Sequence, residues 1–159
     1  MSFIGLEGRY NFTSFGASLE YGQFTRHGSW SAGLSWNNNI ADVVYSGKSI
    51  GNFDYAHAVA EGEYRFRFIS TRSRVFNAYV GMGLFLGVEW IDPRGAWKGN
   101  PEMPYSGVSF LYGVQPCVDL EVFVLPRMAL ELGFGVPVNF SSRIRKVNYY
   151  PSLGVMYEF

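Results

Sequence analysis

Few residues in this sequence could support catalysis. It contains two histidines, His27 and His57, and one cysteine, Cys117. A serine hydrolase needs a nucleophile, a general base and an orienting acid within reach of one another. Ser106 and Ser109 are candidate nucleophiles, but no Gly-x-Ser-x-Gly element occurs and no pattern pairs either serine with His57. We therefore expect no enzymatic activity and interpret His57 as a hydrogen-bonded structural residue, with a lipid hydrolase as the less favoured alternative.

Metal and cofactor sites also lack a sequence signal. A single cysteine excludes an internal disulfide and a cysteine-rich zinc site. The histidines and acids show no ligand cluster with the spacing that metal sites require. We expect neither a cofactor nor a bound metal.

The composition limits the class of protein to which these residues belong. The chain has 159 residues, 16% charged and 18% aromatic, with 19 glycines and a formal net charge of zero. That length fits one domain, residues 1–159. Zero net charge argues against nucleic-acid binding. No apolar run is long enough for a membrane-spanning helix, and the N-terminal residues show no signal-peptide pattern.

Apolar and polar residues alternate strictly along most of the chain. In residues 128–140 the odd-numbered and even-numbered positions form opposite faces, and residues 76–90 repeat the scheme. A period of two is that of β-strands. We predict an all-β fold, an eight-stranded antiparallel up-and-down barrel, with strands at residues 2–10, 15–24, 29–37, 53–68, 75–91, 109–124, 128–140 and 148–159. The connections at 25–28, 69–74 and 125–127 are tight turns, whereas 38–52, 92–108 and 141–147 are longer loops.

Three features indicate that the apolar face meets lipid, although a soluble barrel with its apolar face inside is the alternative. Many glycines lie on the polar face, which suits the narrow interior of a small barrel. Aromatic residues mark the strand ends, as in the girdles of membrane barrels; they include Trp30, Trp36, Phe76, Trp90, Phe110 and Phe140. The third feature is the C-terminus, where Leu153, Val155, Tyr157 and Phe159 share a face and resemble the signal read by the barrel-insertion machinery. We predict a bacterial outer-membrane protein with both termini in the periplasm.

The predicted lumen carries an excess of acidic residues. Its charged residues are Glu7, Arg9, Glu20, Glu61, Glu63, Arg65, Arg67, Glu89, Asp119, Glu121, Glu131 and Glu158. Buried charges persist only when they are paired and hydrogen-bonded. We therefore expect a structural network in which Arg9, Arg65 and Arg67 each bridge several carboxylates. A gated or proton-linked path through the lumen is the alternative.

The predicted outer loops hold candidate contact residues. Trp97, Met103 and Tyr105 are large apolar groups in a proline-stiffened segment, which is typical of contact surfaces but also compatible with packing at the barrel mouth. Arg143, Arg145 and Lys146 form a small basic cluster. Lipopolysaccharide phosphates could neutralise it, and an ordinary solvated loop is equally compatible.

The residues from about 53 to 159 resemble a known family. The positions are Glu61-Gly62-Glu63-Tyr64, Arg72, Asn77, Gly81, Gly87, Glu89, Ile91, Arg94, Gly95, Phe110-Leu111-Tyr112-Gly113, Glu121, Arg127, Leu130, Pro151-Ser152-Leu153-Gly154-Val155 and Phe159. In these positions the chain resembles the conjugative-transposon protein TraO of Bacteroidetes. The resemblance implies an outer-membrane component of a conjugative transfer apparatus, with no catalytic residues to carry over.

These observations together favour a non-enzymatic outer-membrane barrel with a structural or interaction role. Its expected partners are membrane lipid and lipopolysaccharide, the insertion machinery and proteins of an envelope assembly. The alternative is a stand-alone barrel that binds surface ligands through its outer loops, and an outer-membrane lipid hydrolase is the less favoured third hypothesis.

Overall fold

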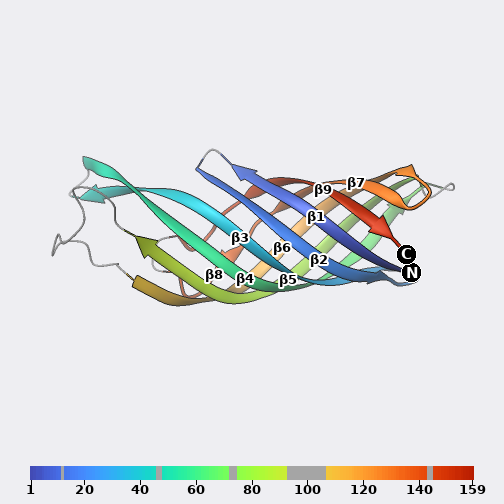
Figure 1. Cartoon of the computed structure of the whole chain (residues 1–159), viewed down its shortest axis with the longest axis horizontal. Helices are drawn as coiled ribbons and strands as arrows, with labels where there is room; N and C mark the ends of the chain where they lie inside the picture. The colour runs from blue at the N-terminus through green and yellow to red at the C-terminus, as the bar shows by residue number, and fades with distance from the viewer. Residues whose placement is uncertain (12, 46–47, 72–74, 93–106, 143–144) are drawn as a thin grey trace.

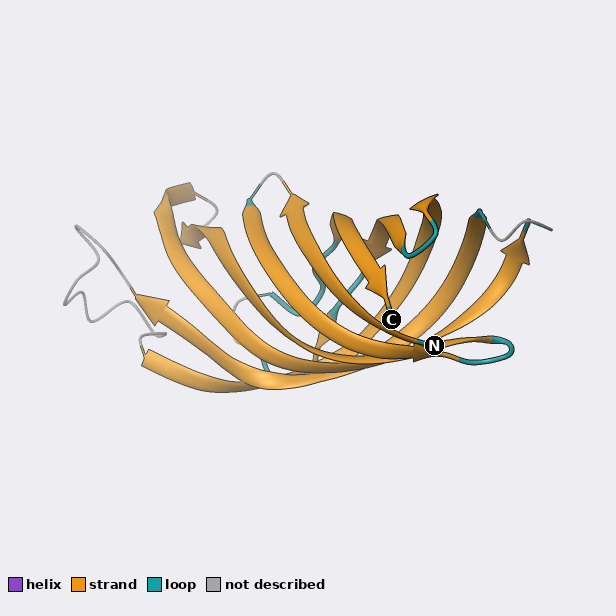
Figure 2. Ribbon diagram, turned by 45° about the vertical axis from the view of Figure 1, so that its right-hand side comes forward, coloured by secondary structure: helices purple, strands orange, loops and turns teal. Residues whose placement is uncertain are grey.

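A computed structural model describes the chain except residues 12, 46–47, 72–74, 93–106 and 143–144, and the side chains of residues 41–53 and 92 also lie outside the description. Within the described residues every regular element is a β-strand (Figure 2). The strands are β1 (Ser2–Asn11), β2 (Ser14–Phe24), β3 (Gly28–Tyr45), β4 (Lys48–Ser70), β5 (Phe76–Asp92), β6 (Gly107–Leu125), β7 (Met128–Gly135), β8 (Val138–Asn139) and β9 (Tyr150–Glu158). The described residues include no helix able to cross a membrane.

The strands close into a barrel. Each pairs antiparallel with its neighbours in the order β1 to β6, then β7 and β9, and β9 pairs with β1. Both β7 and β8 pair with β6, so they form one strand of the barrel, interrupted at Val136 and Pro137. Pro137 has no backbone N–H to donate to a ladder. The structure thus confirms the predicted fold, an eight-stranded antiparallel up-and-down transmembrane barrel.

Side chains alternate between the two faces of the wall. Burial in β9 alternates at every residue, and β1 follows the same period. Outward residues are large and apolar; Leu34, Leu84 and Leu153 are 68%, 65% and 59% exposed. Such a belt of exposed apolar side chains around a closed barrel is the surface that lipid covers.

Several inward positions are glycine because the lumen leaves no space for a side chain. A Cβ added to Gly81 would lie 2.6 Å from the sulfur of Cys117 and 2.9 Å from Cγ of Arg65. A Cβ at Gly62, which is exposed, would meet no atom within 4 Å. The predicted link between inward glycines and a narrow interior therefore agrees with the local packing.

The connections differ from the prediction at one end of the barrel. The chain termini and the last residues of β2, β4 and β6 lie at one end, and the last residues of β1 lie at the other (Figure 1). The prediction of a loop at 38–52 is wrong, because β3 and β4 continue their ladder to Tyr45 and Lys48. The asparagines and glycines in this segment indicated a loop, yet pairing between two adjacent strands satisfies their backbone groups equally well.

The last predicted strands are also shorter than expected. Residues 128–140 divide into β7 and β8, and β9 begins at Tyr150 rather than at residue 148. The predicted loop 92–108 lies largely outside the described residues. At the boundary that is described, β6 begins at Gly107, two residues before its predicted start.

Candidate functional site

The lumen contains two arginine-centred clusters. In the Arg9 cluster, the guanidinium donates to both carboxylate oxygens of Glu61 at 2.6 and 2.7 Å and to Glu7 Oε2 at 3.3 Å. Ser18 donates to Glu7 at 2.8 Å, and Ser35 donates to Glu61. Arg9 is 7% exposed. The guanidinium of Arg9 thus binds two carboxylates, and each carboxylate also accepts a hydrogen bond from a serine hydroxyl.

The Arg65 cluster has a more uneven geometry. Arg65 is 2% exposed and donates through Nη1 to Glu131 Oε1 at 2.7 Å and through Nε to Ser29 at 3.2 Å. Its contacts with Glu63 and Asp119 are longer, 3.6 and 3.9 Å. Several carboxylates therefore surround one guanidinium, which makes short hydrogen bonds to only one of them among the described residues.

The remaining predicted lumen charges occupy other positions. Glu20 lines the same cavity as Arg65. Glu121 is fully buried and accepts from Asn77 at 2.7 Å. Glu158, 8% exposed, lines the cavity at the end of the barrel that holds the termini.

The prediction that Arg67 bridges several carboxylates is wrong. Its guanidinium donates to the backbone carbonyl of Arg26 at 3.0 Å, and no described carboxylate forms an ion pair with it. The reason is position. Arg67 is the last inward cation before β4 ends, where a turn carbonyl is nearer than the lumen acids.

A third cluster joins His57 to two serines through Glu89. His57 Nε2 lies 3.0 Å from Glu89 Oε2, Ser142 donates to the same oxygen at 2.8 Å, and Ser109 donates to Glu89 Oε1 at 3.2 Å. Glu89 is fully buried and His57 is 7% exposed. In a serine hydrolase the histidine stands between serine and acid. Here the acid stands in the middle, and both serines donate to Glu89.

Sequence reasoning did not find this third cluster as a unit. The strand register places His57 beside Glu89 and Glu89 beside Ser109 on adjacent strands. An alignment of β4 with β5 and of β5 with β6 in this register would predict the contact of Glu89 with His57 and with Ser109. Ser142 follows β8, which pairs with β6. It reaches Glu89 of β5 across the intervening strand β6, so no local sequence signal could have identified it.

Cavities show how much of the lumen is filled. Two cavities in the barrel have volumes of about 40 Å³ each, and they are lined by the Arg9 and Arg65 clusters and by His57 with its neighbours. About three water molecules fit such a volume. A third cavity, of about 590 Å³, lies at the end with the termini and is lined by Arg67, Glu121 and Glu158 among others. The charged side chains thus fill most of the middle of the barrel.

The loop candidates are only partly described. Trp97, Met103, Tyr105 and Arg143 lie outside the described residues. Arg145 and Lys146 are exposed, and their backbone carbonyls accept hydrogen bonds from Asn139. On β9 and at the chain end, Leu153, Val155, Tyr157 and Phe159 all face outward, between 43% and 59% exposed.

Comparisons with known proteins identify the fold. No protein-family model matches the chain, and no curated protein matches it significantly. Among solved structures it is similar to Neisserial surface protein A, at 14% identity and a TM-score of 0.56, covering 99% of this chain and 94% of that one. It also matches the attachment invasion locus protein Ail of Yersinia pestis at 17% identity and a TM-score of 0.46, covering 99% and 95%.

These comparisons give the TraO resemblance no support. Its positions Arg72, Arg94 and Gly95 lie outside the described residues. At these identities the likeness to solved structures concerns the fold alone, and that fold is a small eight-stranded membrane barrel.

Proposed function

We propose that this chain is a non-enzymatic bacterial outer-membrane barrel that presents a projecting β-ribbon to a protein partner outside the cell, with its termini in the periplasm. The observation that carries the proposal is the length of β3 and β4. They have 18 and 23 residues, whereas β1 has 10. A membrane-spanning strand needs about 9–11 residues. Both strands therefore continue well beyond a span, at the end opposite the termini (Figure 1).

Among the described residues, no third strand lies beside the projecting part. β2 pairs with β3 only as far as Asn39, and β5 pairs with β4 only from Asp54 onward. Residues 41–45 and 48–53, which we call the outer ribbon, therefore pair only with each other among the described residues. At about 3.3 Å per residue, the longer strand of the outer ribbon extends for about 20 Å.

The outer ribbon has the backbone chemistry of a peptide-binding edge. A strand edge without a neighbour presents N–H and C=O groups that an extended segment of another protein can pair with. The predicted loop residues Trp97, Met103 and Tyr105, and the basic residues Arg145 and Lys146, would add side-chain contacts to a protein or to lipopolysaccharide phosphates. The filled lumen supports an interaction role over diffusion of solutes through the barrel.

Site-specific photo-crosslinking in native membranes tests the proposal. A photoreactive residue at Val44 should capture a defined protein, and the same residue at the outward, membrane-belt position Leu34 should capture only lipid or insertion factors. Replacing the outer ribbon by a short turn should abolish the capture of that partner by a second photoreactive residue at Lys146. Crosslinks from Val44 to lipid alone, or none, would contradict an interaction role for the ribbon.

Membership of a conjugative transfer apparatus is a narrower form of this proposal, and the TraO resemblance supports it. It predicts that the partner captured at Val44 is another envelope protein encoded with the transfer system. It also predicts that deleting the gene lowers the frequency of DNA transfer between cells. Normal transfer by a deletion strain would refute this assignment while leaving the interaction role intact.

A further inference from the structure

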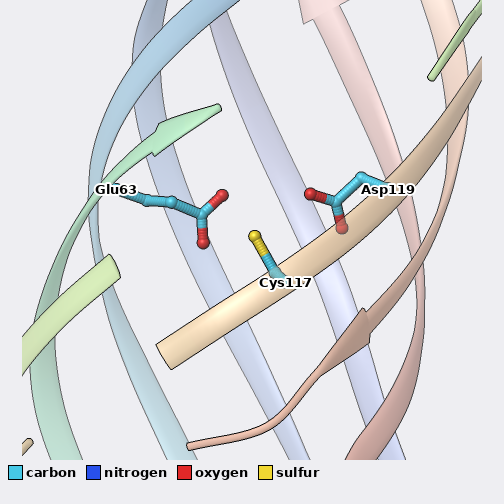
Figure 3. Close-up of side chains that lie close together, drawn as sticks. All are labelled: Glu63, Cys117 and Asp119. Carbon is cyan, nitrogen blue, oxygen red and sulfur yellow. The ribbon is translucent and has the colours of Figure 1, made fainter. Parts of the chain in front are cut away.

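Three potential metal ligands converge inside the barrel. Glu63 comes from β4, and Cys117 and Asp119 come from β6; their side chains point toward one another in the lumen (Figure 3). One donor atom from each residue lies within 4.8 Å of the other two. Because β5 lies between β4 and β6 in the sheet, this contact crosses the lumen side of a whole strand.

The carboxylates in this group are poorly matched by the nearby cation. Arg65 makes its short hydrogen bonds to Glu131 and Ser29, and its 3.6 and 3.9 Å contacts with Glu63 and Asp119 are too long to be hydrogen bonds. Glu20 adds a further carboxylate to the same cavity. Four acids thus surround one guanidinium, and a second cation would offset part of the excess negative charge.

Asp119 provides a separate indication of a missing partner. It is only 6% exposed, and its Oδ2 has no hydrogen-bond partner. A buried polar atom without a partner is costly, which makes such atoms rare in folded proteins. The side chain lines the 40 Å³ cavity together with Glu63 and Cys117. That volume accommodates one cation and a coordinated water.

We propose that Glu63, Cys117 and Asp119 bind one divalent cation of the Zn²⁺ type. One sulfur and two carboxylate oxygens, completed by water, form a four-ligand set that suits Zn²⁺, whereas Mg²⁺ and Ca²⁺ select oxygen ligands alone. On binding, the thiol of Cys117 loses its proton to solvent and its sulfur forms the bond to the metal. The bound ion links β4 to β6 across β5 and offsets the surplus carboxylate charge.

The absence of a sequence signal for this site has a simple reason. Glu63 lies more than fifty positions before Cys117, and Cys117 and Asp119 alone form no metal-binding motif. The sequence-based expectation of no metal rests on spacing along the chain. The strand pairing of the barrel brings these distant residues together in space.

The test is a metal titration of the full-length barrel, folded in detergent and stripped of metal with a chelator. Isothermal titration with Zn²⁺ should show one equivalent bound by the wild type. Titration with Co²⁺ should produce a near-ultraviolet sulfur-to-cobalt charge-transfer band. Cys117→Ser should abolish that band and weaken Zn²⁺ binding by more than about tenfold, and Asp119→Asn should weaken binding similarly. Glu121→Gln removes a buried carboxylate from the same strand outside the cluster, so binding should remain at the wild-type level.

Two results would overturn the proposal. One is the absence of Zn²⁺ binding by the folded wild type. The other is wild-type binding by Cys117→Ser, which would assign the ion to a surface group such as exposed His27. If Asp119→Asn does not fold, Cys117→Ser decides by itself, because it preserves the size of the side chain. Retarded or accelerated migration on unheated gels reports whether each variant has formed the barrel.

Discussion

Replacement of Arg65 by methionine should strongly destabilise the barrel. The substitution preserves most of the side-chain volume but removes the 2.7 Å contact with Glu131 and the hydrogen bond to Ser29. It also removes the guanidinium that lies 5.7 and 5.5 Å from the ring centres of Phe3 and Tyr79. Breaking a buried ion pair by removing one partner costs about 3–5 kcal/mol, because the other charge stays buried without compensation. We expect a loss of that size in the free energy of unfolding.

The assay is urea unfolding of the protein refolded into lipid vesicles, followed by the fluorescence of its four tryptophans. Arg67→Met is the matched control, since it changes the same residue type two positions along β4. Arg67 makes one hydrogen bond to a turn carbonyl and is partly exposed. Its loss should cost less than about 1.5 kcal/mol.

A double variant tests the reasoning behind the magnitude. If stranded carboxylates cause the loss, Arg65→Met combined with Glu131→Gln should be less destabilised than the sum of the two single variants, by at least about 1 kcal/mol. Equal costs for Arg65→Met and Arg67→Met would refute the assignment of Arg65 as the centre of the lumen network. Additive costs in the double variant would show that Arg65 contributes packing rather than charge compensation.

Three further outcomes are expected. Gly81→Val should destabilise the barrel by about 1–3 kcal/mol or prevent folding, because its side chain would overlap lumen groups, whereas Gly62→Ala on the open outer face should change the midpoint of urea unfolding little. Phe159→Ala should slow assembly by the insertion machinery in reconstituted membranes but not spontaneous folding in detergent; Phe68→Ala, another exposed aromatic, is the control, and equal assembly rates would contradict a C-terminal signal. His57→Ala should leave lipid A and phospholipids intact on thin-layer chromatography, as in the wild type; cleavage by the wild type that disappears in the variant would contradict the non-enzymatic assignment.

Much of the fold was accessible from the alternation of residue types. The two-residue period placed the lumen acids and the apolar belt on opposite faces, and the tight turns at one end followed from it. The composition of residues 38–52 predicts a loop because asparagine and glycine are typical of turns. That prediction is wrong, since β3 and β4 pair with each other there, and this pairing is not visible in either strand alone. The alternation predicts the same role for Arg67 as for Arg9 and Arg65, because all three side chains face inward. Arg67 lies near the end of β4, however, and donates to a turn carbonyl, whereas Arg9 and Arg65 lie deeper in the lumen and bind carboxylates.

The sequence by itself determined which side chains share a face of the wall, because successive residues of a strand point to opposite sides whatever the strand pairs with. The glycines on the polar face, the aromatic strand ends and the apolar face of the C-terminus then indicated that the polar face lines the lumen. It also determined the charge of that lumen, nine acids against three bases. Only the tertiary structure decided which of these groups meet. The pairing register brought Ser142 to Glu89 across β6, and set Glu63 opposite Cys117 across β5. Those contacts depend on the stagger between paired strands. The pattern of residues within one strand does not encode that stagger.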